Sequence, residues 1–172
     1  GDPYVLQVQF AFDGLKQIKA FVRALQAAIQ RHDILRTSVH WQGLDEAVQV
    51  VWRQAPLALE RVDADPQDGD VLQQMQARFD PRHYRLDFSK ASLMRFAYTY
   101  DPRDPHDPDQ SRWIGILLLH HLVLDHTALD VLVQELSASL CGQALPPTAA
   151  VPYRNYVAQA RLGLSEAEHE AF

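Results

Sequence analysis

The feature that most constrains this chain is an uninterrupted apolar run that ends in a cluster of histidines. Residues Trp113–Leu119 read WIGILLL, and His120–His126 follow at once as HHLVLDH. Such a run is typical of a strand buried on both faces. Thr127–Leu140 then places apolar residues at helical spacing, which predicts an amphipathic helix. The histidines therefore sit on a strand-to-helix turn, where side chains are held rigidly and can still face a cleft.

The rest of the chain mixes strand and helix patterns. Alternating apolar residues predict strands, and apolar residues three and four apart predict helices. The expected strands are Tyr4–Phe12, Ile34–Trp41, Ala47–Trp52 and Leu93–Tyr100, and the expected helices are Leu15 to about His32, Val71–Phe79 and Tyr153–Leu162. Asp63–Asp70 and the proline-rich Asp101–Asp109 are expected to be loops. The pattern predicts an α/β (α+β) fold with a mixed sheet flanked by helices.

Composition limits what the protein can bind. The net charge of -6 and the absence of a Lys/Arg run argue against nucleic acid, and no apolar stretch approaches the ~20 residues that a membrane span needs. One cysteine, Cys141, rules out an internal disulfide and fits a cytoplasmic protein. The chain begins at Gly1 without Met, and Ser165–Glu168 reads as the start of a helix close to Phe172. We expect a segment of a longer protein, cut at both ends.

The histidine turn is the most reactive group in the sequence. An imidazole titrates near neutral pH, so His121 is suited to move a proton or to position a substrate. Asp125 follows four residues later and has three possible roles: orienting His121, pairing with an arginine, or capping the helix from Thr127. In the second or third role, Asp125→Asn is expected to cost roughly 1–3 kcal/mol of stability.

A metal site is an alternative interpretation of the same turn. His120, His121, Asp125 and His126 are all residue types that bind zinc or iron. However, adjacent residues of a strand point to opposite faces, which separates His120 from His121. The remaining histidines are scattered along the chain, at His32, His40, His83, His106 and His169. We therefore expect no stoichiometric metal in the purified protein.

The turn resembles the HHxxxDG signature of the condensation domains of nonribosomal peptide synthetases, which share the chloramphenicol acetyltransferase-like fold. Three further segments match that family in the same order. Arg31–Thr37 (RHDILRT) is similar to its RHExLRT motif, Tyr84–Arg95 (YRLDFSKASLMR) to its FDLSxxPLxR segment, and Pro152–Tyr156 (PYRNY) to its xYxDY/F segment. The matches cover most of the chain. They imply the N-terminal one of the two lobes of such a domain, over residues 1–172, with a C-terminal lobe as its partner.

The resemblance implies an acyltransferase that forms an amide bond. The donor acyl or peptidyl group and the aminoacyl acceptor would arrive on phosphopantetheine arms of carrier proteins, with no cofactor bound directly. Adjacent synthetase domains are the other implied partners. The active-site residue is His121, with His120 and Asp125 completing the motif. Arg31, Arg36 and Arg95 are candidates to pair with Asp125 and support the site.

Two alternatives stay open, and one departure from the family pattern favours the first of them. His126 stands where the family has glycine, which would allow a positive φ or a close backbone approach. A degenerate, non-catalytic condensation domain that serves as an interdomain platform is the first alternative. A free-standing, coenzyme A-dependent acyltransferase of the same fold is the second. Substrate identity depends on a tunnel of which half would lie outside this chain.

Overall fold

The computed structural model describes residues 2–103, 111–143, 152–155 and 157–158. Its strands are β1 (Val5–Phe12), β2 (Thr37–His40), β3 (Val48–Val51), β4 (Ala58–Arg61), β5 (Met94–Asp101) and β6 (Arg112–His120). Its α-helices are α1 (Leu15–Arg31), α2 (Val71–Arg78) and α3 (His126–Leu140), and 3-10 turns occupy Asp33–Arg36 and Pro66–Asp68. None of the described helices is both long and apolar enough to cross a membrane.

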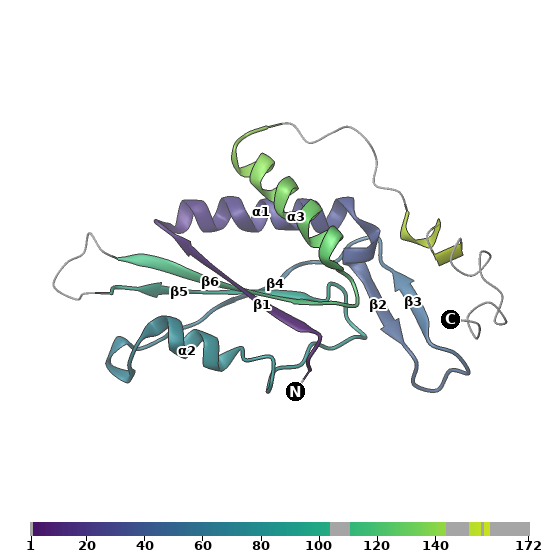
Figure 1. Cartoon of the computed structure of the whole chain (residues 1–172), viewed down its shortest axis with the longest axis horizontal. Helices are drawn as coiled ribbons and strands as arrows, with labels where there is room; N and C mark the ends of the chain where they lie inside the picture. Colours follow the sequence, from purple (N-terminus) through teal and green to yellow (C-terminus); the bar gives the residue numbers. More distant parts are fainter. Residues whose placement is uncertain (1, 104–110, 144–151, 156, 159–172) are drawn as a thin grey trace.

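The main sheet is mixed, and the apolar run is its central strand. Four strands lie in the order β1-β6-β5-β4; β6 runs antiparallel to β1 and β5, while β4 runs parallel to β5. Helices α1 and α3 cover one face of this sheet and α2 covers the other (Figure 1). The predicted fold class is therefore confirmed. Strands β2 and β3 form a separate two-stranded hairpin that projects beside the sheet (Figure 1).

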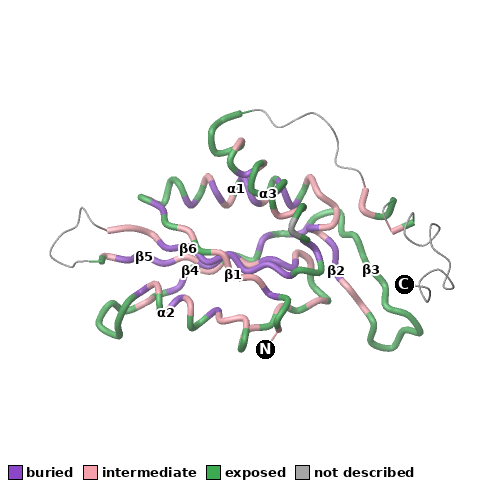
Figure 2. Tube along the Cα trace, in the orientation of Figure 1, coloured by how far each residue is buried: buried purple, intermediate pink, exposed green. Residues whose placement is uncertain are grey.

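Burial on both faces explains why β6 is apolar throughout rather than alternating. Leu117 and Leu119 pack into the core beneath α1 and α3, whereas Ile116 and Leu118 pack into a smaller core that includes Met75 of α2. Figure 2 shows the middle of the sheet buried and the hairpin strand β3 exposed. The end of β6 is thus held between two layers, which fixes the start of the histidine turn.

Helices α1 and α3 are amphipathic, with differences from the expected stripes. The sequence places Leu15, Ile18, Leu25 and Ile29 of α1 at helical spacing, and all of them except Leu15 in the first turn are buried. In α3, Leu132 and Leu136 are buried. Val133 and Leu140 belong to the same run of helically spaced apolar residues, but they are about half exposed, at 52% and 48%. The buried face of α3 is therefore narrower than the sequence pattern predicts.

Several boundaries differ from the sequence prediction. The first residues of the expected strand Ile34–Trp41 form the 3-10 turn, and strand β4 was not predicted at all. The expected helix from Tyr153 has helical backbone at 153–155 and 157–158, and the rest of it lies outside the described residues. Most of the loop Asp101–Asp109 and the helix start at Ser165–Glu168 also lie outside them; Asp101 itself ends β5.

Glu60 connects β4 to β5 and to α2 through its carboxylate. Its carboxylate accepts hydrogen bonds from Arg95 of β5 and from Arg78 of α2, the latter at 2.8 Å. Partial burial acts to raise the pKa of Glu60, but the two guanidinium groups more than offset it and the pKa is lowered. Because the folded-state pKa lies below the unfolded value, this stabilisation is present above the unfolded pKa and is lost as pH falls through the folded pKa.

Glu60→Gln is therefore expected to lower the free energy of unfolding at neutral pH by at most about 1 kcal/mol. The variant and the parent should converge as the pH falls through the range below 4.5, where the carboxyl protonates. Urea denaturation across that pH range is the measurement, with the exposed Glu46→Gln as control. A constant difference between variant and parent at every pH would contradict this role of the charge.

Candidate functional site

The histidine turn is built by main-chain hydrogen bonds at the end of β6. The His121 N–H donates to the Tyr4 carbonyl of the segment that leads into β1, at 2.9 Å. The Val123 N–H donates to the His120 carbonyl at 3.1 Å. Val123 and Leu124 are buried, so the turn is anchored by apolar contacts as well. Residues 121–124 therefore present their side chains from a fixed backbone.

The side chain of His121 is exposed and has a defined tautomer. Its Nδ1 lies 3.1 Å from the Leu124 carbonyl oxygen. A carbonyl can only accept, so Nδ1 carries the proton and donates it. In the neutral ring the other nitrogen, Nε2, then has a free lone pair that can accept a proton. This arrangement is that of a general base or a hydrogen-bond acceptor held at a fixed angle.

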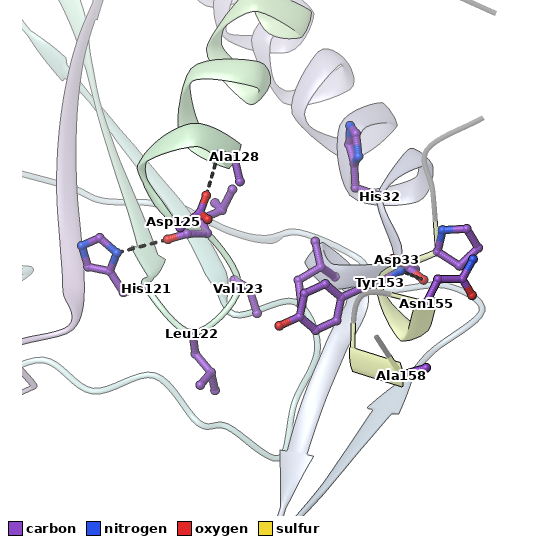
Figure 3. A pocket seen from close by; sticks show the side chains of 13 residues that line it. His32, Asp33, His121, Leu122, Val123, Asp125, Ala128, Tyr153, Asn155 and Ala158 are labelled. Atoms are coloured by element: carbon purple, nitrogen blue, oxygen red, sulfur yellow. Dashed lines mark hydrogen bonds between the residues drawn. The ribbon is translucent and has the colours of Figure 1, made fainter. Parts of the chain in front are cut away.

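Asp125 caps α3. Its Oδ1 accepts the Ala128 N–H at 2.7 Å, and the residue is exposed (Figure 3). Of the three roles that the sequence left open, the structure shows the helix cap. The capping bond fixes the chain where the turn enters α3, and the turn carbonyl that orients His121 belongs to the preceding residue. Asp125 thus fixes the backbone at the end of the turn through its capping bond.

The candidate arginines are engaged elsewhere in the fold. Arg31 Nε lies 3.1 Å from Oε1 of Glu135 on α3, Arg36 donates to the Trp52 carbonyl, and Arg95 pairs with Glu60. Within the described ranges, no ion pair joins Asp125 to an arginine. Among the described residues, the structure therefore shows Asp125 as a helix cap and not as the partner of an arginine. The physical reason is that each guanidinium group already contacts a carboxylate or a main-chain carbonyl elsewhere in the fold.

This geometry also changes the expected effect of Asp125→Asn. An asparagine oxygen accepts the same capping bond, and Asn is as good an N-cap as Asp, so this variant should keep nearly full stability. Asp125→Ala should instead cost about 1 kcal/mol. Asp70→Ala is the matched comparison, since Asp70 Oδ1 caps α2 through Gln73 N–H at 2.8 Å. Equal unfolding midpoints for Asp125→Ala and the parent in urea would contradict the capping role.

His120 and His121 are separated by the end of the strand. His120 is buried, at 5% exposure, and its ring lies edge-on to Phe88 with centroids 4.8 Å apart. Its Nδ1 accepts the Leu122 N–H at 2.9 Å. The ring is therefore packed in the structure, whereas the His121 ring reaches solvent. Of the two, His121 is the one positioned to meet a substrate.

A cavity of about 870 Å³ lies beside the turn. It is lined by residues 121–125 and by Ala128, by residues 32–34 just after α1, and by Pro152, Tyr153, Asn155 and Ala158. Figure 3 shows His121 on one side of the turn and Tyr153 with Asp33 on the other. His121 thus stands at the edge of the cavity and faces away from its far wall.

Asp33 closes that far wall. Both of its carboxylate oxygens lie 3.0 Å from the Tyr153 N–H, which ties the segment after α3 to the end of α1. The sequence analysis placed these residues in family-like motifs but did not predict that they line the cavity with His121. The motif matches could have indicated this wall. Residues of two of the four matched motifs, Arg31–Thr37 and Pro152–Tyr156, line it together.

His126 opens α3, so its backbone is helical. A residue in that conformation has a negative φ, which any L-amino acid adopts. The positive φ that glycine would permit is therefore not needed at this position. The substitution of histidine for glycine therefore introduces no backbone strain here.

No group of three or more His, Cys, Asp or Glu side chains is placed to hold a metal ion among the residues that the structure describes. His120 and His121 cannot act together as ligands here, because one ring is buried beside Phe88 and the other is exposed. His106 and His169 lie outside the described residues. Elemental analysis that found one tightly bound zinc or iron per chain would contradict the expectation of a metal-free protein.

Comparison with known proteins shows the family of this chain. The sequence profile of the condensation domain matches residues 1–172. Malpinin synthetase of Mortierella alpina is 44% identical over 174 residues, and malpibaldin synthetase of the same organism is 38% identical over 172 residues; both alignments cover 100% of this chain. The chain belongs to the condensation-domain family, and the resemblance drawn from its motifs is confirmed.

The solved structures show the same fold, and they show how much of a condensation domain this chain covers. The condensation domain of the monacolin K polyketide synthase superposes with a TM-score of 0.70 at 17% identity, covering 98% of this chain and 36% of that one. The fold is that of a chloramphenicol acetyltransferase-like lobe. The chain spans 2% of the length of malpinin synthetase and 3% of malpibaldin synthetase.

Proposed function

We propose that residues 1–172 form the N-terminal lobe of a condensation domain in a nonribosomal peptide synthetase, and that His121 acts in amide-bond formation. The observation that carries the proposal is the state of the His121 ring. Its Nδ1 donates to the Leu124 carbonyl, so in the neutral ring Nε2 is the acceptor, on an exposed side chain beside a large cavity. The family membership supports the reaction class.

The chemistry requires little more than a positioned base. The amine of an aminoacyl acceptor attacks the carbonyl carbon of a donor thioester. The new C–N bond forms, the C–S bond breaks, and the amine loses a proton while the leaving thiolate gains one. His121 Nε2 is suited to accept that proton or to orient the amine for attack. Holding two tethered substrates together supplies a large share of the rate enhancement.

The proposed partners follow from this reaction. Peptidyl or acyl carrier proteins deliver both substrates on phosphopantetheine arms in the cytoplasm, and neighbouring synthetase domains load them. A second lobe covers the cavity beside His121 and completes the site, which accords with a match to about a third of a solved condensation domain. No cofactor of the lobe's own is proposed.

The isolated 172-residue chain is expected to fold but to form no amide. It holds a mixed sheet with helices on both faces, yet its cavity is bounded by one lobe alone. The test mixes the chain with loaded donor and acceptor carrier proteins and searches for the amide product by mass spectrometry, with the intact synthetase as control.

Turnover by the chain alone would contradict the two-lobe proposal and favour an independent transferase. Turnover with acetyl-coenzyme A as donor would identify the coenzyme A-dependent alternative. An intact synthetase that loads its carriers but forms no amide would instead favour the non-catalytic platform.

A further inference from the structure

The buried ring of His120 has a contact that the proposed reaction does not use. Its Nε2 lies 3.3 Å from Oδ2 of Asp2, a residue outside every motif that the sequence analysis singled out. Both side chains are largely shielded from water, at 6% and 13% exposure. The carboxylate oxygen therefore faces this ring nitrogen at short range, although the two atoms are not aligned as a hydrogen bond.

The other contact of the ring fixes its tautomer. His120 Nδ1 accepts the Leu122 N–H, so Nδ1 carries no proton. A neutral ring must then carry its proton on Nε2, the nitrogen that faces the Asp2 carboxylate. The two adjacent histidines therefore hold opposite tautomers, with the proton on Nε2 in His120 and on Nδ1 in His121.

Asp2 is itself held in place by the backbone around it. Its Oδ1 accepts the Tyr4 N–H at 3.1 Å, and its own N–H donates to the Pro81 carbonyl at 3.0 Å. The Tyr4 carbonyl in turn accepts the His121 N–H at 2.9 Å. The short segment from Asp2 to Tyr4 thus contacts both histidines, one through a carboxylate and the other through the main chain.

We propose that Asp2 is a positioning residue that acts on His121 through His120. The carboxylate favours the Nε2–H form of His120, which keeps Nδ1 free to accept the Leu122 N–H. That bond holds the middle of the 121–124 turn, whose last carbonyl orients the His121 ring. The effect on catalysis rests on the proposed function of His121, whereas the effect on the tautomer does not.

Asp2→Asn is a sharp test because it keeps the size of the side chain. The Asn oxygen remains bonded to the Tyr4 N–H, so the amide NH₂ group faces His120 Nε2. Two donors then oppose each other, and the Nε2–H form of His120 is disfavoured. Asp65→Asn is the matched control, because Asp65 Oδ1 accepts the Gln67 N–H in the same i to i+2 arrangement on an exposed surface.

The first measurement is the ¹⁵N NMR spectrum of the histidine rings in the 172-residue chain, with thermal melting to confirm that each variant folds. The parent and Asp65→Asn should show protonated Nε2 in His120 and protonated Nδ1 in His121. Asp2→Asn should lose the His120 signature and shift the His121 ring signals. Unchanged ring signals in folded Asp2→Asn would overturn the proposal.

The second measurement is amide transfer in the intact synthetase. Asp2→Asn is expected to lower kcat about tenfold with KM changed by less than about twofold, since the misplaced group is His121 rather than a substrate contact. If His121→Ala inactivates the synthetase but Asp2→Asn leaves kcat unchanged, the proposal for Asp2 is overturned. The role of His121 would then still stand. If His121→Ala retained full activity, the proposed function would fail, and the ring spectra alone would decide whether Asp2 sets the tautomer.

Discussion

Replacing His121 with alanine in the intact synthetase is expected to abolish amide transfer while leaving the thermal unfolding midpoint unchanged. The ring is exposed, so its loss opens no cavity in the core. Its one described side-chain bond goes to the Leu124 carbonyl, which water can satisfy after the substitution. Loss of a positioned base lowers rates by about 10²–10⁴-fold. Initial rates of transfer between loaded carriers, measured beside thermal melting, test the expectation.

His83→Ala is the matched control for this variant. His83 is also an exposed histidine, and it does not line the cavity. Its replacement should change neither transfer nor melting. Equal losses of activity in the two variants would show that the assay responds to surface changes in general, and would remove the special role assigned to His121.

The largest expected effect on stability comes from Gly115→Ala on β6. A Cβ atom at Gly115 would lie 2.7 Å from Phe96 Cζ and 2.9 Å from Phe12 Cε2, well inside van der Waals contact. Both rings belong to the core beneath α1, and Phe96 is fully buried. Overpacking of this kind costs about 1–3 kcal/mol or more. The unfolding midpoint in urea should fall accordingly.

Gly14→Ala provides the comparison, because a Cβ at Gly14 meets nothing within 4 Å. Gly14 is the N-cap of α1, so a cost of less than about 1 kcal/mol is expected there. If Gly115→Ala were no more destabilising than Gly14→Ala, the close packing of Phe12 and Phe96 against Gly115 of β6 would be contradicted.

The strand, the turn and the helix around the histidines were predictable from local pattern. The run Trp113–Leu119 is apolar at every position because both faces of β6 are covered, and that feature is visible in the sequence. Strand β4 was not visible, because Ala58–Arg61 has neither alternation nor bulk. Its place is set by parallel pairing with β5 and by the bonds of Glu60.

The site was predictable in its residues but not in its contacts. The sequence indicated His121 and Asp125 and left three roles for the carboxylate. Only the fold shows that Asp125 caps α3 while the arginines bond elsewhere. The contact of Asp2 with His120 joins residues that are far apart in the chain, and no periodic pattern reports such a contact.

The most direct test of the central claim is a single-turnover experiment with pre-loaded donor and acceptor carriers. Intact-protein mass spectrometry of the acceptor carrier measures the amide product before any reloading or release. The account predicts full conversion by the intact synthetase and by His83→Ala, and conversion at least about 100-fold slower with His121→Ala. Conversion by folded His121→Ala at the parent rate would contradict the claim that this histidine carries the chemistry.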